Sequence, residues 1–115
     1  MMPRERARLA ADIFASRRTR DDVFTGLLDG FGEPAWDMLL ILYIADHGGA
    51  TQTPSELVEA TRVEAATAAP YITWLKSQGL VQVDGDEVSL TDIGRKRMDA
   101  YLDRRGAQKD FGGLH

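Results

Sequence analysis

Apolar and polar residues follow two different periods along this chain, and the change of period marks a short hairpin between helices. Between residues 80 and 91 the apolar side chains recur at every second position, as in a strand with one buried face. Asp84 and Gly85 separate the two runs, and glycine readily adopts the positive φ of a tight hairpin turn. Gly79 is suited to end the preceding helix and Thr91 to cap the following one. We therefore expect a two-stranded hairpin over these residues.

The helical period of 3.6 residues predicts five or six helices. Their expected spans are Pro3 to about Arg18, a short and weaker stretch near residues 23–31, Ala35 to about His47, Pro54 to about Ala60, Glu64 or Thr67 to Gln78, and a last helix after Thr91. The stretch from Ala35 is apolar nearly all round, so we expect it to be the central helix. Thr53, Pro54 and Glu56 form the capping-box signature of a helix start.

Two helices joined by a brief turn at Arg62 and Val63, then a hairpin, are the layout of a winged helix-turn-helix. We therefore predict a mainly α fold, a winged helix-turn-helix with an added N-terminal helix and a two-stranded β wing. The expected divisions are an N-terminal helical extension at residues 1–30, which is a candidate dimerisation arm, the winged helix-turn-helix domain at 31–105, and a flexible tail at 106–115.

The net charge of -4 is distributed unevenly. Residues 1–20 carry six arginines and two acids, residues 21–61 carry eight acids and no lysine or arginine, and residues 91–115 carry six bases and four acids. Basic ends therefore flank an acidic middle, which differs from the broad basic surface of a typical nucleic-acid-binding domain.

The residue content also excludes several kinds of site. The chain has no cysteine, which excludes disulfides and thiolate metal sites. Its two histidines, His47 and His115, are too few for a histidine-based metal site. No nucleophile–base set or phosphate-binding glycine loop is present, so we predict neither an enzyme nor a cofactor. No apolar run reaches the roughly 20 residues of a membrane span, and the chain opens with alternating arginines, so we predict a cytoplasmic protein without a membrane partner.

Three stretches resemble small bacterial winged-helix proteins of the MarR type: FGEPAWDMLLILYIA, TPSELVEATRVEAATAAPYITWLKSQGLV and VSLTDIGRKRM. The resemblance covers roughly Phe31 to Leu102. It implies a transcriptional regulator that binds double-stranded DNA as a homodimer, with the second helix of the motif in the major groove and the wing beside a phosphate backbone. The apolar residues expected to join two copies through the terminal helices are Leu9, Ile13, Phe14, Met98, Tyr101 and Leu102.

The helical period assigns a core side and an outer side to this second helix. The expected core residues are Ala65, Ala68, Ile72 and Leu75, and the expected DNA-facing residues are Ala66, Thr67, Pro70, Thr73, Trp74 and Ser77. The candidate phosphate contacts are Arg4, Arg8, Arg17, Arg18, Arg20, Arg62 and Lys76. None of the outer side chains is an arginine, lysine, asparagine or glutamine, the types that pair with purine edges. Proteins of the resembled type commonly carry arginine at the position of Pro70.

Pro70 leaves the course of this helix open. The helix either begins near Thr67, which places Pro70 in its tolerant first turn, or begins near Glu64 and kinks at a proline in its interior. The outer face also permits an alternative function, a winged helix repurposed for contact with another protein at Trp74, with weak or no DNA binding. An exposed aromatic residue in an uncharged patch is typical of such a surface. In a third interpretation, Trp74 packs against Val83 or Val88 of the wing.

Overall fold

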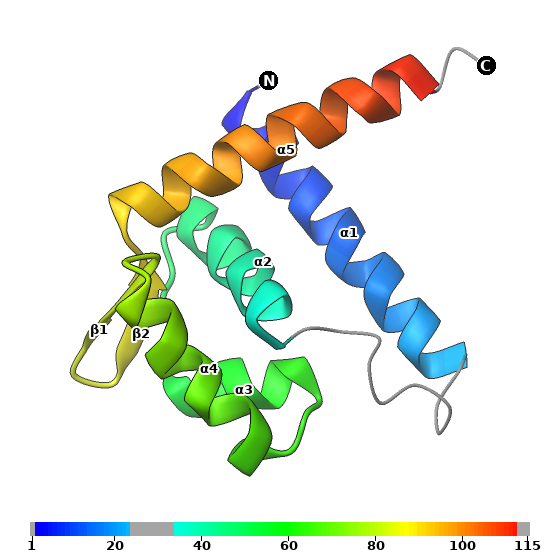
Figure 1. Ribbon diagram of the computed structural model, residues 1–115. Helices are drawn as coiled ribbons and strands as arrows, with labels where there is room; N and C mark the ends of the chain where they lie inside the picture. Colours follow the sequence, from blue (N-terminus) through cyan, green and yellow to red (C-terminus); the bar gives the residue numbers. More distant parts are fainter. Residues whose placement is uncertain (1, 24–33, 113–115) are drawn as a thin grey trace.

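The structure is a computed structural model that describes residues 2–23 and 34–112, with side chains described within 2–15 and 34–103. In this part of the chain the protein is mainly helical, as predicted, with a two-stranded antiparallel sheet (Figure 1). The elements are α1 (Pro3–Val23), α2 (Pro34–His47), α3 (Pro54–Thr61), α4 (Ala65–Ser77), β1 (Val81–Asp84), β2 (Glu87–Leu90) and α5 (Asp92–Gly112). The weaker helix predicted near 23–31 lies almost wholly outside the described residues.

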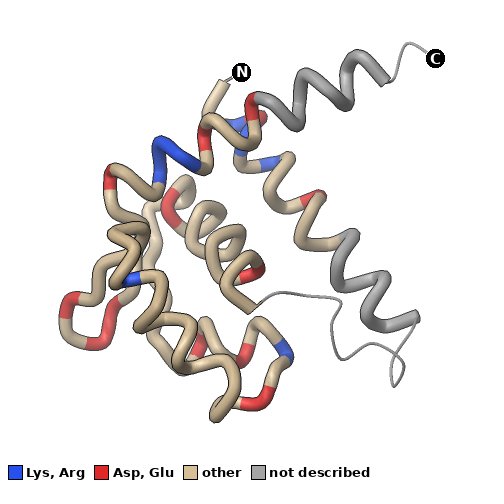
Figure 2. Tube along the Cα trace, viewed as in Figure 1, with Lys and Arg blue, Asp and Glu red and all other residues tan. Residues whose placement is uncertain are grey.

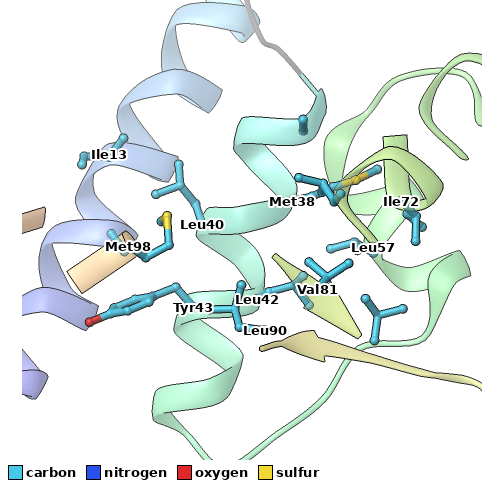
Figure 3. Close-up of a cluster of buried hydrophobic side chains, with 14 of the residues drawn as sticks. Ile13, Met38, Leu40, Leu42, Tyr43, Leu57, Ile72, Val81, Leu90 and Met98 are labelled. Carbon is cyan, nitrogen blue, oxygen red and sulfur yellow. The ribbon is translucent and has the colours of Figure 1, made fainter. Parts of the chain in front are cut away.

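The central position predicted for α2 is confirmed. This helix packs against α1 and α5 on one side and against α3, α4 and β2 on the other. Figure 3 shows Leu40 and Tyr43 directed toward α1 and α5, while Met38 and Leu42 are directed toward α4 and the hairpin. All four side chains are buried. A helix that is apolar nearly all round therefore serves two core regions at once.

The hairpin forms where the alternating pattern predicts it, but its turn is shifted by one residue. Asp84 pairs with Glu87 as the last pair of the ladder, so the loop consists of Gly85 and Asp86. Gly85 has φ 62°, the left-handed conformation that glycine adopts without strain. An isolated bridge joins Val88 to Gln52, with an N–O distance of 2.7 Å from the Val88 amide to the Gln52 carbonyl. This bridge ties the hairpin to the segment between α2 and α3.

Capping hydrogen bonds from nearby residues fix the starts of α3 and α5. Thr53 and Glu56 form the predicted capping box, in which each side chain accepts a hydrogen bond from the other residue's backbone amide. At the start of α5, Thr91 Oγ1 accepts from the Gly94 amide at 3.0 Å and donates to the Gly79 carbonyl at 2.6 Å. Thr91 therefore caps α5 as predicted and also fastens it to the end of α4.

The two terminal helices are longer than predicted and α1 belongs to the core. α1 continues to Val23 rather than ending near Arg18, and α5 continues to Gly112 through most of the segment that we expected to be a tail. The α1 side chains Leu9 and Ile13 are buried against the chain's own core. The described side chains of α1 therefore contribute to the core of the fold.

An ion-pair network fastens α1 to α5. Arg6 Nε donates to Asp103 at 2.9 Å, and Tyr43 Oη donates to Asp99 at 2.6 Å. Arg6 also lies 3.7 Å from Asp99. Burial and the hydrogen bond to Asp99 both raise the pKa of Tyr43, so this phenol remains a donor. Three helices thus meet at one polar cluster.

Most of the apolar residues expected to form a dimer interface are covered within one chain. Leu9, Ile13, Met98 and Leu102 are all buried in the structure of a single copy. Phe14 is partly buried against the same core, and Tyr101 packs edge-on against Trp36 with ring centroids 4.7 Å apart. The four buried residues therefore need no second copy to cover them, whereas Tyr101 remains 37% exposed, and the homodimer stays a prediction.

Candidate nucleic-acid interface

A short turn joins α3 to α4, and one residue in it, Arg62, has a left-handed backbone conformation. Arg62 adopts the left-handed conformation, with φ 59° and ψ 20°, and its amide donates to the Glu59 carbonyl at 3.1 Å. This arrangement ends α3 in the manner of a left-handed cap. The chain then reverses direction and α4 begins at Ala65, packed against α2, α3 and β1.

The predicted sides of α4 are mostly confirmed. Ala68, Ile72 and Leu75 are buried, and every residue assigned to the outer side is exposed: Ala66, Thr67, Pro70, Thr73, Trp74 and Ser77. Ala65 is exposed, so its assignment to the core side is wrong. It is the first residue of the helix, and the burial of α4 begins only at Ala68.

Pro70 lies inside α4 rather than in its first turn. The helix starts at Ala65, which corresponds to the second of the two predicted courses. Because proline has no backbone N–H, the carbonyl of Ala66 loses the intrahelical partner that residue 70 would otherwise supply. The middle of the outer face therefore carries an apolar ring in place of a hydrogen-bonding side chain.

The outer face can donate few hydrogen bonds. Ser77 Oγ donates to the Trp74 carbonyl of its own helix at 2.6 Å, so its proton is already used. Thr67 and Thr73 are the remaining hydroxyl groups among the predicted DNA-facing residues. Hydroxyl groups can contact phosphate oxygens, but they identify a base pair less well than bidentate side chains do.

A pocket lies beside the outer face, toward the start of α2. Its described lining residues are Ala35, Pro70, Tyr71 and Trp74, and its volume is about 460 Å³. Trp74 is 49% exposed and Tyr71 is 37% exposed. About half of the Trp74 side chain is therefore open to solvent, and its packing against Val83 or Val88 stays a prediction. The pattern analysis did not single out Tyr71 or Ala35, although Tyr71 lies three positions before Trp74 on the same side of the helix.

The candidate phosphate contacts fall into separate groups. Arg62 and Lys76 are exposed near the two ends of α4. Arg4 and Arg8 are exposed on α1, which lies across α2 from α4 (Figure 1). The structure therefore places Arg62 and Lys76 at the α4 surface, whereas Arg4 and Arg8 lie apart from it. The side chains of Arg17, Arg18 and Arg20 lie outside the described residues.

Acidic residues surround the same surface. Figure 2 shows acidic positions at the hairpin turn and at the start of α4, whereas basic positions gather at the beginnings of α1 and α5. Asp84, Asp86 and Glu87 of the hairpin are exposed. A hairpin of this charge repels a phosphate backbone, so any attraction to nucleic acid depends on the few bases beside α4.

No protein-family model, curated protein or solved structure matches the chain. Among the described residues, no cluster of acidic residues or histidines has the geometry of a metal site. In the same residues, no helix is long and apolar enough to cross a membrane.

Proposed function

We propose that this chain is a cytoplasmic winged helix-turn-helix protein, similar to the MarR type, that binds double-stranded DNA and regulates transcription. The observation that supports the proposal is the sequence of elements α3, a left-handed turn at Arg62, α4 and an antiparallel hairpin. In helix-turn-helix proteins the second helix enters the major groove. Here α4 takes that place, and its outer face is exposed along its whole length.

The chemistry of α4 supports weak discrimination between sequences. Arg62 and Lys76 can pair with phosphates, and Thr67 and Thr73 can donate to them, whereas Ala66 offers a methyl contact to thymine. Phosphate contacts position a protein on the duplex without reading its bases. We therefore expect modest affinity and a shallow dependence on base sequence, with a homodimer doubling the contacts.

Position 70 provides the test, because it lies at the centre of the outer face. Pro70→Arg places a guanidinium where a recognition helix reads guanine, and one bidentate contact contributes about 1–3 kcal/mol of discrimination. We expect Pro70→Arg to bind DNA more tightly and to select a base at one position of a randomised duplex pool. The measurement is selection from the pool, followed by titration of the enriched duplex at low salt.

Pro70→Ala is the matched control. It restores the backbone N–H that proline lacks but adds no charge, so it separates repair of the helix from base recognition. We expect Pro70→Ala to leave affinity and selectivity near those of the unmodified protein. The proposal that α4 contacts DNA would be contradicted if both variants enriched the same duplexes equally, or if Pro70→Arg enriched none.

A further inference from the structure

The pocket beside α4 adjoins the predicted DNA-facing residues of this helix and shares Pro70 and Trp74 with them. At 100° per residue, the predicted DNA-facing crest consists of Ala66, Pro70, Thr73 and Ser77, and the buried side is centred on Ala68, Ile72 and Leu75. Tyr71 and Trp74 lie between these two sides, three residues apart, so their rings are neighbours on successive turns. Ala35 of α2 also lines the pocket.

The shape of this pocket restricts the peptide that can occupy it. Its described lining consists of residues of α2 and α4, and these two helices offer no strand edge to which a peptide could add a strand. Two exposed aromatic rings and a proline resemble instead the aromatic-lined grooves that hold polyproline II segments.

The charge around the pocket favours a peptide that carries a positive charge. Between residues 34 and 90 the chain carries eight acids, with Arg62 and Lys76 as the bases. Glu64 lies seven residues before Tyr71, hence on nearly the same side of the helix. Its side chain is exposed and makes no hydrogen bond to cap α4. A carboxylate in this position is complementary to a cation on the peptide.

The distance from Tyr71 to Glu64 along α4 is close to the length of three residues of a polyproline II peptide. Seven residues of α-helix rise about 10 Å, and three residues of polyproline II rise about 9 Å. A basic residue three positions from a proline seated at Tyr71 and Trp74 therefore reaches Glu64. We propose that the pocket binds a short proline-rich, basic segment of a partner protein, with a proline ring against Trp74 and an arginine or lysine at Glu64. This site does not depend on DNA binding.

A fluorescein-labelled peptide tests the proposal directly. The probe has two central prolines with an arginine three residues to each side, and its binding to the intact protein is followed by fluorescence anisotropy without DNA. Two control peptides replace the arginines by glutamates or the prolines by glycines. We expect saturable binding of the probe and at least about tenfold weaker binding of each control peptide, because each loses one of the two recognised features.

Variants locate the site on the protein. We expect Trp74→Ala to weaken binding roughly thirtyfold, as truncation of an aromatic anchor does, and Glu64→Gln to weaken it about two- to fivefold as loss of an exposed ion pair. The matched controls are Ile93→Ala, since Ile93 is 57% exposed on α5, and Asp84→Asn on the hairpin; both should bind normally. Tyr71→Ala is a second pocket variant if Trp74→Ala folds poorly by circular dichroism.

Three results would overturn the proposal. They are no binding of the arginine–proline probe, binding that survives both pocket substitutions in folded protein, and equal binding of the glutamate peptide. The first and second would show that the pocket is not a peptide site. The third would show that charge does not select its occupant.

Discussion

At the scale of single residues, Gly94 has the tightest surroundings among the described glycines. A Cβ atom built at this position would lie against the carbonyl oxygen of Leu80, well inside van der Waals contact. Thr91 fixes this approach by capping α5 and binding the Gly79 carbonyl at once. Glycine is therefore required here by close backbone packing rather than by its φ angle.

We expect Gly94→Ala to lower the free energy of unfolding by about 1–3 kcal/mol, as overpacking does elsewhere. The matched control is Gly48→Ala, where a Cβ would meet only ordinary contacts and φ is not positive. That change should be neutral or stabilising by about 0.4–1 kcal/mol. Urea unfolding of both variants measures the difference, and equal stability of the two would contradict the packing argument.

Residues with local roles were predictable from sequence, and residues with distant partners were not. The capping roles of Thr53, Glu56 and Thr91 depend on neighbours within three positions. The contact of Arg6 with Asp103 joins positions far apart in the chain, and no local pattern signals it. The same reason explains Tyr71 and Ala35, which meet at the pocket only because α4 packs against α2.

At the scale of elements, the start of α3 carries a pH-dependent contribution to stability. The backbone hydrogen bond from Thr53 holds the pKa of Glu56 below its ordinary value of 4.5, and the Thr53 side chain acts in the same direction. A carboxyl whose pKa is lower in the folded protein contributes stability above its unfolded pKa. That contribution is lost as the pH falls through the folded pKa.

We therefore expect Glu56→Gln to reduce the acid sensitivity of the fold. The stability difference between the unmodified protein and this variant should be present at pH 7 and should shrink below about pH 4.5, because glutamine does not titrate. Glu59→Gln is the control, since it changes another exposed acid of α3 and leaves the cap intact. Urea unfolding between pH 7 and pH 3 measures the effect, and a constant difference would contradict it.

Element types were predicted more reliably than element ends. The hairpin and α2 follow from a clear period, whereas α1 and α5 continue beyond their expected limits. The arginines at positions 17, 18 and 20 interrupt the apolar stripe without being poor helix formers, so the helix has no local reason to stop there. Similarly, the turn of the hairpin depends on which residues pair across it, and Asp84 pairs with Glu87.

At the scale of the whole molecule, charge is separated between two regions. The bases near the starts of α1 and α5 lie at one end, and the acids of α3, of the turn before α4 and of the hairpin lie around the other (Figure 2). Two bases of the end regions are held in ion pairs, Arg6 with Asp103 and Arg95 with Asp46. Among the candidate contacts whose side chains the structure describes, Arg62 and Lys76 lie near the ends of α4, so the proposed attraction to a DNA duplex through α4 depends on these two.

The salt dependence of binding to random duplex DNA tests this account most directly. Two phosphate contacts predict that the logarithm of the binding constant falls with the logarithm of salt concentration at a slope of about -1.8 per chain. Lys76→Gln should reduce this slope by about 0.9, and Lys96→Gln, which removes an exposed lysine from α5, should leave it unchanged. Absence of binding at low salt, or a slope that Lys76→Gln does not alter, would contradict DNA binding through α4.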